Sequence, residues 1–120
     1  MNIIYTEEKK FTEENVQELF LSVNWISGEY PKRLYKALLN SSTVITAWDN
    51  SKLVGLIRVL DDSEMLAYIH YVLVHPEYNK KGIATTMVKM VKKNIKTFFI
   101  LNLCQKKEKM QFFMKNLVLK

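Results

Sequence analysis

A segment around residue 80 combines the residue types that bind phosphate groups. A loop that enters a helix through glycine presents backbone N–H groups at the positive end of the helix dipole, where anions bind. Gly82 would let an anion approach the backbone closely, and a small residue at Ala84 would not block it. The pattern predicts a phosphate site, although a lone glycine at a helix start is often only a turn. The contributing residues would be Asn79, Lys80, Lys81, Gly82, Ile83, Ala84 and Thr85, with a further hydroxyl donor from Thr86.

Two familiar phosphate loops do not match this spacing. A Walker loop needs glycine, four residues, then Gly-Lys and Ser or Thr, which the chain lacks. The three glycines of a dinucleotide fingerprint are also missing here. The phosphate would therefore be held by a single glycine, the helix N-terminus and two lysines.

The elements that must position this loop follow from hydrophobic periodicity. Residues 2–5 are a short apolar strand candidate, and Thr12 is an N-cap followed by two glutamates in the first helical turn. Pro31 suits the first position of a second helix. Residues expected to face the core are Val16, Leu19, Phe20 and Val23 in the first helix, and Leu34, Leu38 and Leu39 in the second.

The middle of the chain has the composition of β-structure. Residues 43–48 and 53–60 are rich in β-branched and apolar residues, and the polar turn between them predicts a hairpin. Another polar turn, at residues 61–64, leads into a longer strand over residues 65–74. Three strands joined by short turns predict an antiparallel meander.

After this strand the pattern becomes that of a crossover. Pro76 ends the strand because proline cannot donate to a ladder. A helix with one apolar face follows from Gly82, and residues 97–103 then form an apolar strand. A strand, a helix and a strand joined in this way place the last strand parallel to the first. A final helix is predicted over residues 107–116.

Residues 68–84 resemble the central motif of the GNAT acetyltransferases. In that family an apolar strand ends in Val-x-Pro-x-x, followed by Gln or Arg, two variable residues, Gly, a variable residue, and Gly or Ala. The segment here ends Val-His-Pro-Glu-Tyr-Asn-Lys-Lys-Gly-Ile-Ala, so Asn79 replaces the Gln or Arg. The Leu-Val-Gly at residues 53–55 and the segment 111–117 also resemble the family. The likeness is closest over residues 53–96.

The resemblance implies one acyl-CoA N-acyltransferase domain over residues 1–120, of α/β (α+β) class. Its mixed sheet would be an antiparallel meander followed by a βαβ crossover, with helices on both faces. The implied activity moves an acetyl group from acetyl-CoA to a primary amine of a small molecule or protein, without a metal. Backbone groups of Val72, Leu73 and Val74 would pair with the pantetheine arm, as an added strand pairs with a sheet edge. Residues 80–85 would hold the pyrophosphate.

The resemblance also indicates candidate residues for chemistry. His70 is the candidate base or proton relay, because an unperturbed imidazole titrates near neutrality. Its alternative role is a strand histidine satisfied by a neighbour or by solvent. Tyr68 lies two residues earlier on the same strand face, where it would relay protons or pack. Trp25 and Tyr30 lie in the break between the first two helices, which usually covers the acceptor in this family, and are expected to bind substrate.

The C-terminal region departs from the family pattern. Many relatives have tyrosine where this chain has Phe113, and a phenyl ring cannot protonate a leaving thiolate. The family usually adds two strands after the last helix, whereas this sequence stops at Lys120. The resulting sheet edge would be exposed, and a homodimer is one way to cover it. These departures keep open a second reading, a catalytically inactive CoA-binding or regulatory module.

Length, charge and cysteine content argue against membrane-spanning, disulfide-bonded and nucleic-acid-binding proteins. The chain has 120 residues, enough for one domain, and no apolar run approaches the ~20 residues that cross a bilayer. Its single cysteine, Cys104, excludes an internal disulfide and fits a reducing, cytoplasmic compartment. The net charge of +6 lies wholly in residues 61–120, which could suit a polyanion. Nucleic acid is disfavoured because the lysines are spread around helices and arginine is absent after Arg58.

Overall fold

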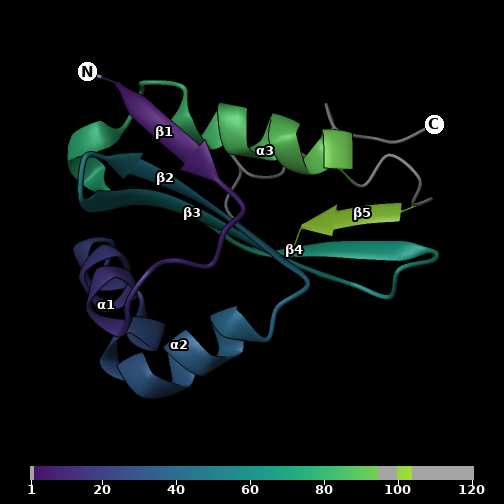
Figure 1. Cartoon of the computed structure of the whole chain (residues 1–120), viewed down its shortest axis with the longest axis horizontal. Helices are drawn as coiled ribbons and strands as arrows, with labels where there is room; N and C mark the ends of the chain where they lie inside the picture. The colour runs from purple at the N-terminus through teal and green to yellow at the C-terminus, as the bar shows by residue number, and fades with distance from the viewer. Residues whose placement is uncertain (1, 95–99, 104–120) are drawn as a thin grey trace.

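A five-stranded mixed sheet forms the centre of the chain (Figure 1). The structure is a computed structural model that describes residues 2–94 and the backbone of residues 100–103. Neighbouring strands pair antiparallel except the last two, which pair parallel, as the sequence predicted. The strand order follows the chain: β1 (Ile3–Thr6), β2 (Thr43–Asp49), β3 (Lys52–Asp61), β4 (Leu66–Val74) and β5 (Ile100–Leu103).

Helices cover both faces of the sheet, which confirms the predicted layers. Figure 1 shows α1 (Glu13–Ser22) and α2 (Pro31–Leu39) on one side and α3 (Ile83–Asn94) on the other. Each face has its own buried cluster, and both clusters include residues of the strands. The α3 cluster includes Ala67, Ile69, Val72, Ile83, Met87 and Val91, and the opposite cluster includes Val16, Phe20, Leu34, Leu38, Leu56 and Leu73.

The predicted helix starts are confirmed, but one predicted core residue is wrong. Thr12 caps α1 with a capping box, in which its hydroxyl accepts from the N–H of Asn15 at 3.1 Å. Leu34 and Leu38 are buried four residues apart on α2, whereas Leu39 is 37% exposed. Leu39 is the last residue of the helix and lies about 100° around its axis from Leu38, away from α1.

A β-bulge interrupts β4 at His70. Arg58 on β3 pairs with Tyr71, whereas its neighbour Val59 pairs with Ile69, so His70 is the extra residue. Ile69 packs in the α3 cluster, but Tyr71 packs against the opposite one. In a regular strand these two side chains would share a face. The bulge therefore turns both His70 and Tyr71 toward the side of α1 and α2.

Gly55 on β3 allows α3 to lie close to the sheet. A Cβ atom at this position would lie 3.0 Å from a methyl carbon of Ile83 and 3.2 Å from Met87. Both are buried residues in the first turns of α3. A side chain at position 55 would push the start of α3 outward, and such overpacking costs roughly 1–3 kcal/mol. Gly55 thus fixes where the N-terminus of α3 lies.

Several predictions fall outside the described residues. They concern strand residues 97–99, Cys104, the helix over residues 107–116 and Phe113. The missing or shortened C-terminal strands, the homodimer and the single domain over residues 1–120 likewise stay predictions. Among the described residues, no helix is both long and apolar enough to cross a membrane.

Candidate active site

The N-terminus of α3 has the geometry expected of an anion site. Gly82 precedes the helix with φ 77°, a conformation that favours glycine. The first helical hydrogen bond runs from the Thr86 N–H to the Gly82 carbonyl at 3.0 Å. The N–H groups of Ile83, Ala84 and Thr85 come before that bond and have no carbonyl partner within the helix. A Cβ atom at Gly82 would meet nothing within 4 Å, so the space beside this backbone is open among the described residues.

The side chains of this loop divide into anchors and solvent-facing groups. Ile83 is only 2% exposed and fixes the first turn against β3. Asn79, Lys80 and Lys81 are exposed, so the two lysines can add charge without holding the loop. The predicted donor role of Thr86 is wrong in this structure, because its hydroxyl donates to the Gly82 carbonyl at 2.8 Å.

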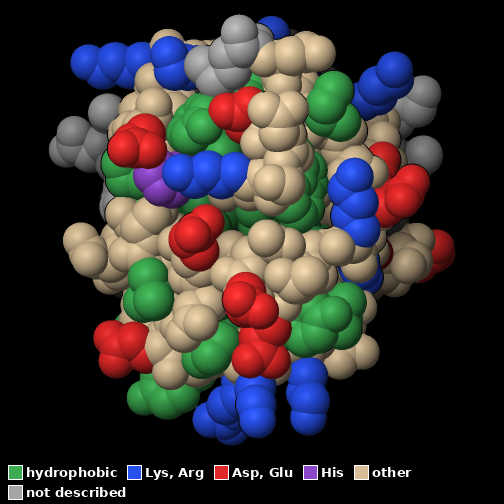
Figure 2. All heavy atoms as spheres, turned by 60° about the vertical axis from the view of Figure 1, so that its left-hand side comes forward, with side chains coloured by type: hydrophobic (Ala, Val, Ile, Leu, Met, Phe, Trp, Pro, Cys, Tyr) green, Lys and Arg blue, Asp and Glu red, His purple; other side chains and the backbone are tan. Residues whose placement is uncertain are grey.

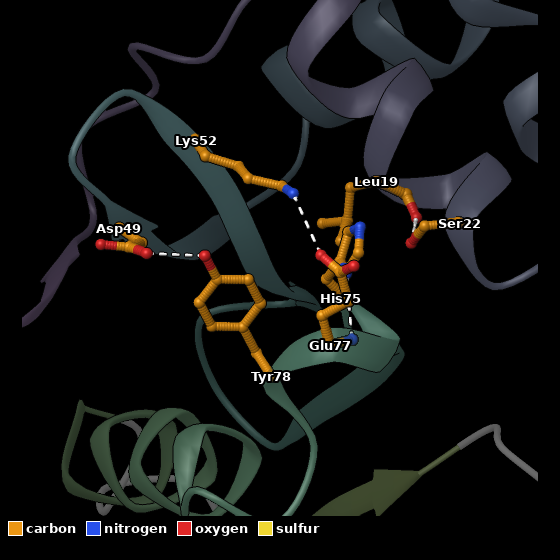
Figure 3. Close-up of polar contacts among 7 residues, drawn as sticks. All are labelled: Leu19, Ser22, Asp49, Lys52, His75, Glu77 and Tyr78. Atoms are coloured by element: carbon orange, nitrogen blue, oxygen red, sulfur yellow. Dashed lines mark hydrogen bonds and ion pairs between the residues drawn. The ribbon is translucent and has the colours of Figure 1, made fainter. Parts of the chain in front are cut away.

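The segment between β4 and α3 is tied to the β2–β3 hairpin. In Figure 3 the Tyr78 hydroxyl points to the carboxylate of Asp49, to which it donates at 2.6 Å. This hydrogen bond raises the pKa of Tyr78 above its usual value, so the hydroxyl remains a donor. An ion pair of 3.6 Å joins Lys52 to Glu77 in η2 (Pro76–Tyr78). The hairpin therefore fixes the position of the segment that leads from β4 into α3.

Among the described residues, the edge of β4 that faces β5 is paired over only part of its length. The described residues of β5 pair with residues 66–69 of β4, which come just before the bulge at His70. Val72, Leu73 and Val74 pair with β3 on the other side of the strand. Within the described part of the chain, their outer edge has no strand partner. An extended ligand could add to that edge as another strand does.

His70 lies in a cluster of aromatic and polar side chains at the bulge. Nη1 of Arg58 lies 2.8 Å from its Nδ1. The ring centroids of Tyr71 and Tyr68 lie 4.1 Å and 6.4 Å from that of His70. Tyr68 and His70 therefore share a face of β4, as the strand alternation predicts.

The bond from Arg58 fixes the protonation state of His70. A guanidinium has only N–H donors, so Nδ1 must accept and the neutral ring carries its proton on Nε2. Burial, and secondly the charge of Arg58, lower the pKa of His70 below its usual value. His70 is consequently a neutral imidazole near pH 7, and its Nδ1 lone pair is occupied.

This lowered pKa predicts a pH dependence of stability. The unfolded chain takes up a proton on His70 at a higher pH than the folded chain does, so stability is lost as the pH falls. We expect the free energy of unfolding to decrease on acidification from about pH 6.5. Urea unfolding at several pH values should show a smaller decrease in His70→Gln. The same slope in both proteins would contradict the inferred protonation state.

The two predicted acceptor residues have different positions. Trp25 packs against the rings of Phe20 and Tyr71, with centroids 5.9 Å and 5.8 Å away. Ser27 in η1 (Ile26–Glu29) is joined to the Tyr71 hydroxyl at 2.8 Å. The break between the first two helices thus lies against the His70 cluster through Trp25. Tyr30 is 54% exposed at the start of α2, and no ring contact links it to this cluster.

Sequence reasoning missed Arg58, Tyr71 and Ser27. Arg58 had a detectable signal, because it is the single charged residue within the apolar strand over residues 53–60. A charge in such a strand needs hydrogen-bonding partners. Tyr71 had no such signal, since its orientation depends on the bulge. The structure brings the predicted residues His70, Tyr68 and Trp25 together around these missed residues. The predicted cofactor-binding residues, between 72 and 85, lie next to this cluster, on the outer edge of β4 and in the loop and first turn of α3.

Two further observations describe the surroundings. Within the described ranges, no three His, Cys, Asp or Glu side chains come together as a metal site would need. On the face shown in Figure 2, basic side chains are interspersed with acidic and apolar ones rather than gathered in one patch. The preference against nucleic acid therefore stays a prediction from the sequence.

Comparison with known sequences identifies relatives of this chain. Residues 4–103 match the model of the acetyltransferase (GNAT) family. An N-acetyltransferase from Pyropia yezoensis is 30% identical over 91 residues, which cover 72% of this chain. The chain spans about half of that relative, 52% of its length.

Solved structures with the same fold include named acetyltransferases. A GNAT family acetyltransferase from Streptococcus pneumoniae has a TM-score of 0.80 and 26% identity, covering 96% of this chain and 85% of its own. An aminoglycoside 6'-N-acetyltransferase in complex with coenzyme A has a TM-score of 0.71 and 18% identity, covering 83% of this chain and 60% of its own.

Proposed function

The chain belongs to the acetyltransferase (GNAT) family, and we propose that it transfers an acetyl group from acetyl-CoA to a primary amine. The observation that carries this proposal is the edge of β4 at residues 72–74, which has no strand partner among the described residues and is followed by the helix N-terminus at Gly82. The coenzyme A bound to the aminoglycoside acetyltransferase of the same fold supports coenzyme A as a ligand. The acceptor would be a small molecule or an exposed amine of a protein.

Each part of the ligand has a matching part of the chain. Backbone groups of Val72, Leu73 and Val74 would pair with the pantetheine arm at the open edge. The pyrophosphate would lie at the start of α3, where N–H groups of residues 83–85 lack helical partners. Gly82 suits this arrangement because the space beside it is open among the described residues. Lys80, Lys81 and Asn79 are exposed and could add donors to the phosphates.

The chemistry needs one proton removed and one supplied. Acetyl-CoA supplies a thioester whose acyl carbon is attacked by the amine nitrogen, and the C–S bond then breaks. The amine must lose a proton, and the departing sulfur must gain one. We assign His70 to this site as a hydrogen-bond donor through Nε2, because Arg58 occupies Nδ1. This donor would stabilise the developing negative charge, and water would protonate the departing thiolate. The amine proton would leave to water, and Tyr68 would relay protons or pack beside the ring.

The proposed function can be tested with acetyl-CoA and a panel of amines. Acetyl-CoA should raise the melting temperature by mass action, increasing with ligand concentration. Release of free thiol in the presence of an acceptor amine would establish transfer. Binding without transfer to any amine would favour the inactive CoA-binding or regulatory module. No thermal shift at any concentration would refute both readings.

A further inference from the structure

Arg58 is a partly buried charged residue within an apolar strand. It is half-buried on β3, with its side chain on the side of α1 and α2, whereas its neighbours Ile57 and Val59 are buried on the opposite face against α3. A charged group in such surroundings is stabilised by hydrogen bonds or by an opposite charge. The question is therefore which hydrogen bonds and which opposite charge the guanidinium has.

The partners of Arg58 are all neutral. Nε donates to the Ser41 hydroxyl at 2.7 Å, Nη1 donates to His70, and the guanidinium lies 5.6 Å from the ring centroid of Tyr71. Among the described residues, no Asp or Glu forms an ion pair with it. A guanidinium has five N–H donors, and these two hydrogen bonds leave the others for a further acceptor. The charge of Arg58 is thus held in place but not compensated by the described chain.

The guanidinium is also well oriented. Ser41 is 3% exposed, and its hydroxyl donates to the Ala37 carbonyl at 2.7 Å, so its oxygen lone pairs face Arg58. The planar group is held from one edge by Ser41, from another by His70, and over the ring of Tyr71. A preorganised fork loses little entropy when an anion binds.

We propose that the acceptor is an amine that also carries a carboxylate, as a free amino acid does, and that Arg58 binds this carboxylate. This inference rests on the proposed acetyl transfer. Arg58 contacts His70, so an anion on the guanidinium would lie next to the proposed transfer site. One guanidinium matches the single charge and planar shape of a carboxylate. A phosphate dianion would require more positive charge than the described cluster contains.

The test compares matched substrates that differ only in the carboxylate. Phenylalanine, histidine and lysine are assayed against phenethylamine, histamine and cadaverine, using wild type and Arg58→Gln with acetyl-CoA. The wild type should favour the carboxylate-bearing member of an accepted pair by roughly 10- to 100-fold in kcat/KM, the scale of a hydrogen bond to a charged group. Arg58→Gln should bring this ratio close to one. Arg58→Lys should retain part of the preference, and the exposed Arg33→Gln serves as the matched control with an unchanged ratio.

The ratio of kcat/KM within each pair distinguishes carboxylate binding by Arg58 from a role of Arg58 in positioning His70. If Arg58 only positions His70, Arg58→Gln would lower both members of a pair equally, and that result would overturn the proposal. A wild type that prefers the simple amines would also overturn it while leaving acetyl transfer intact. If no member of any pair is acetylated, calorimetry measures binding of the same acids and amines to the CoA-loaded protein. Arg58-dependent binding of the acids without acetylation would refute the transfer but support the carboxylate site, and no binding of either kind would refute the site.

Discussion

Replacing Gly82 with valine is expected to lower the affinity for acetyl-CoA by at least about 10²-fold, the equivalent of two lost hydrogen bonds to a charged phosphate. The added side chain would enter the open space beside the N–H groups of residues 83–85, where the pyrophosphate is proposed to lie. Isothermal titration with acetyl-CoA measures the change. An affinity within a few-fold of wild type would refute the assignment of this loop.

A second variant separates obstruction of the ligand from backbone strain. Gly82 has φ 77°, and a β-branched residue there is strained whether or not a ligand is bound. Asparagine tolerates positive φ much better but still adds a side chain. Gly82→Asn should therefore keep a melting temperature near that of wild type and still bind acetyl-CoA weakly. Full affinity in Gly82→Asn would mean that the valine acts through strain alone.

Most of the fold could be predicted because its signals are local. Thr12 and Pro31 mark helix starts through their own hydrogen-bonding and dihedral restrictions, and α1 and α2 begin where these residues predict. The apolar strands and their short polar turns predict the meander, and the longer connection through α3 requires a parallel return. The loop before α3 could be predicted from Gly82, because its backbone has a positive φ that favours glycine at this one position.

The surroundings of His70 could not be predicted, because they depend on strand register. Arg58 and His70 are 12 residues apart and meet only because β3 and β4 pair with a bulge between them. Simple alternation would place Tyr71 on the face of Ile69, and therefore away from Trp25. No local pattern in the sequence marks the extra residue of a bulge. The close approach permitted by Gly55 likewise depends on how α3 crosses β3.

This register changes the role expected of His70. A base must have a free lone pair, and in the neutral ring Nδ1 already accepts from Arg58. Protonating Nδ1 would break that bond and place two positive charges side by side. The lowered pKa of His70 agrees with that penalty. A neutral ring with its proton on Nε2 can instead stabilise developing negative charge on oxygen or sulfur.

His70→Ala is expected to lower kcat by roughly 10²- to 10³-fold, as loss of one donor to a developing anion does in other enzymes. The affinity for acetyl-CoA should stay nearly unchanged, because the proposed contacts with the ligand come from the backbone beyond residue 70. Steady-state kinetics combined with titration of acetyl-CoA separates the two quantities. A parallel loss of affinity and turnover would mean that His70 is structural.

Glutamine at position 70 distinguishes a donor from a base. Its amide oxygen can accept from Arg58 while its NH2 group donates, as the two nitrogens of His70 do in the neutral ring. An amide cannot accept a proton near pH 7, so it can replace a donor but not a base. If His70 is a donor, His70→Gln should retain activity within about tenfold of wild type, well above His70→Ala, because the amide replaces the donor whose loss is costly. Equally low turnover in both variants would instead identify His70 as the base and require Arg58 to release Nδ1 during the reaction.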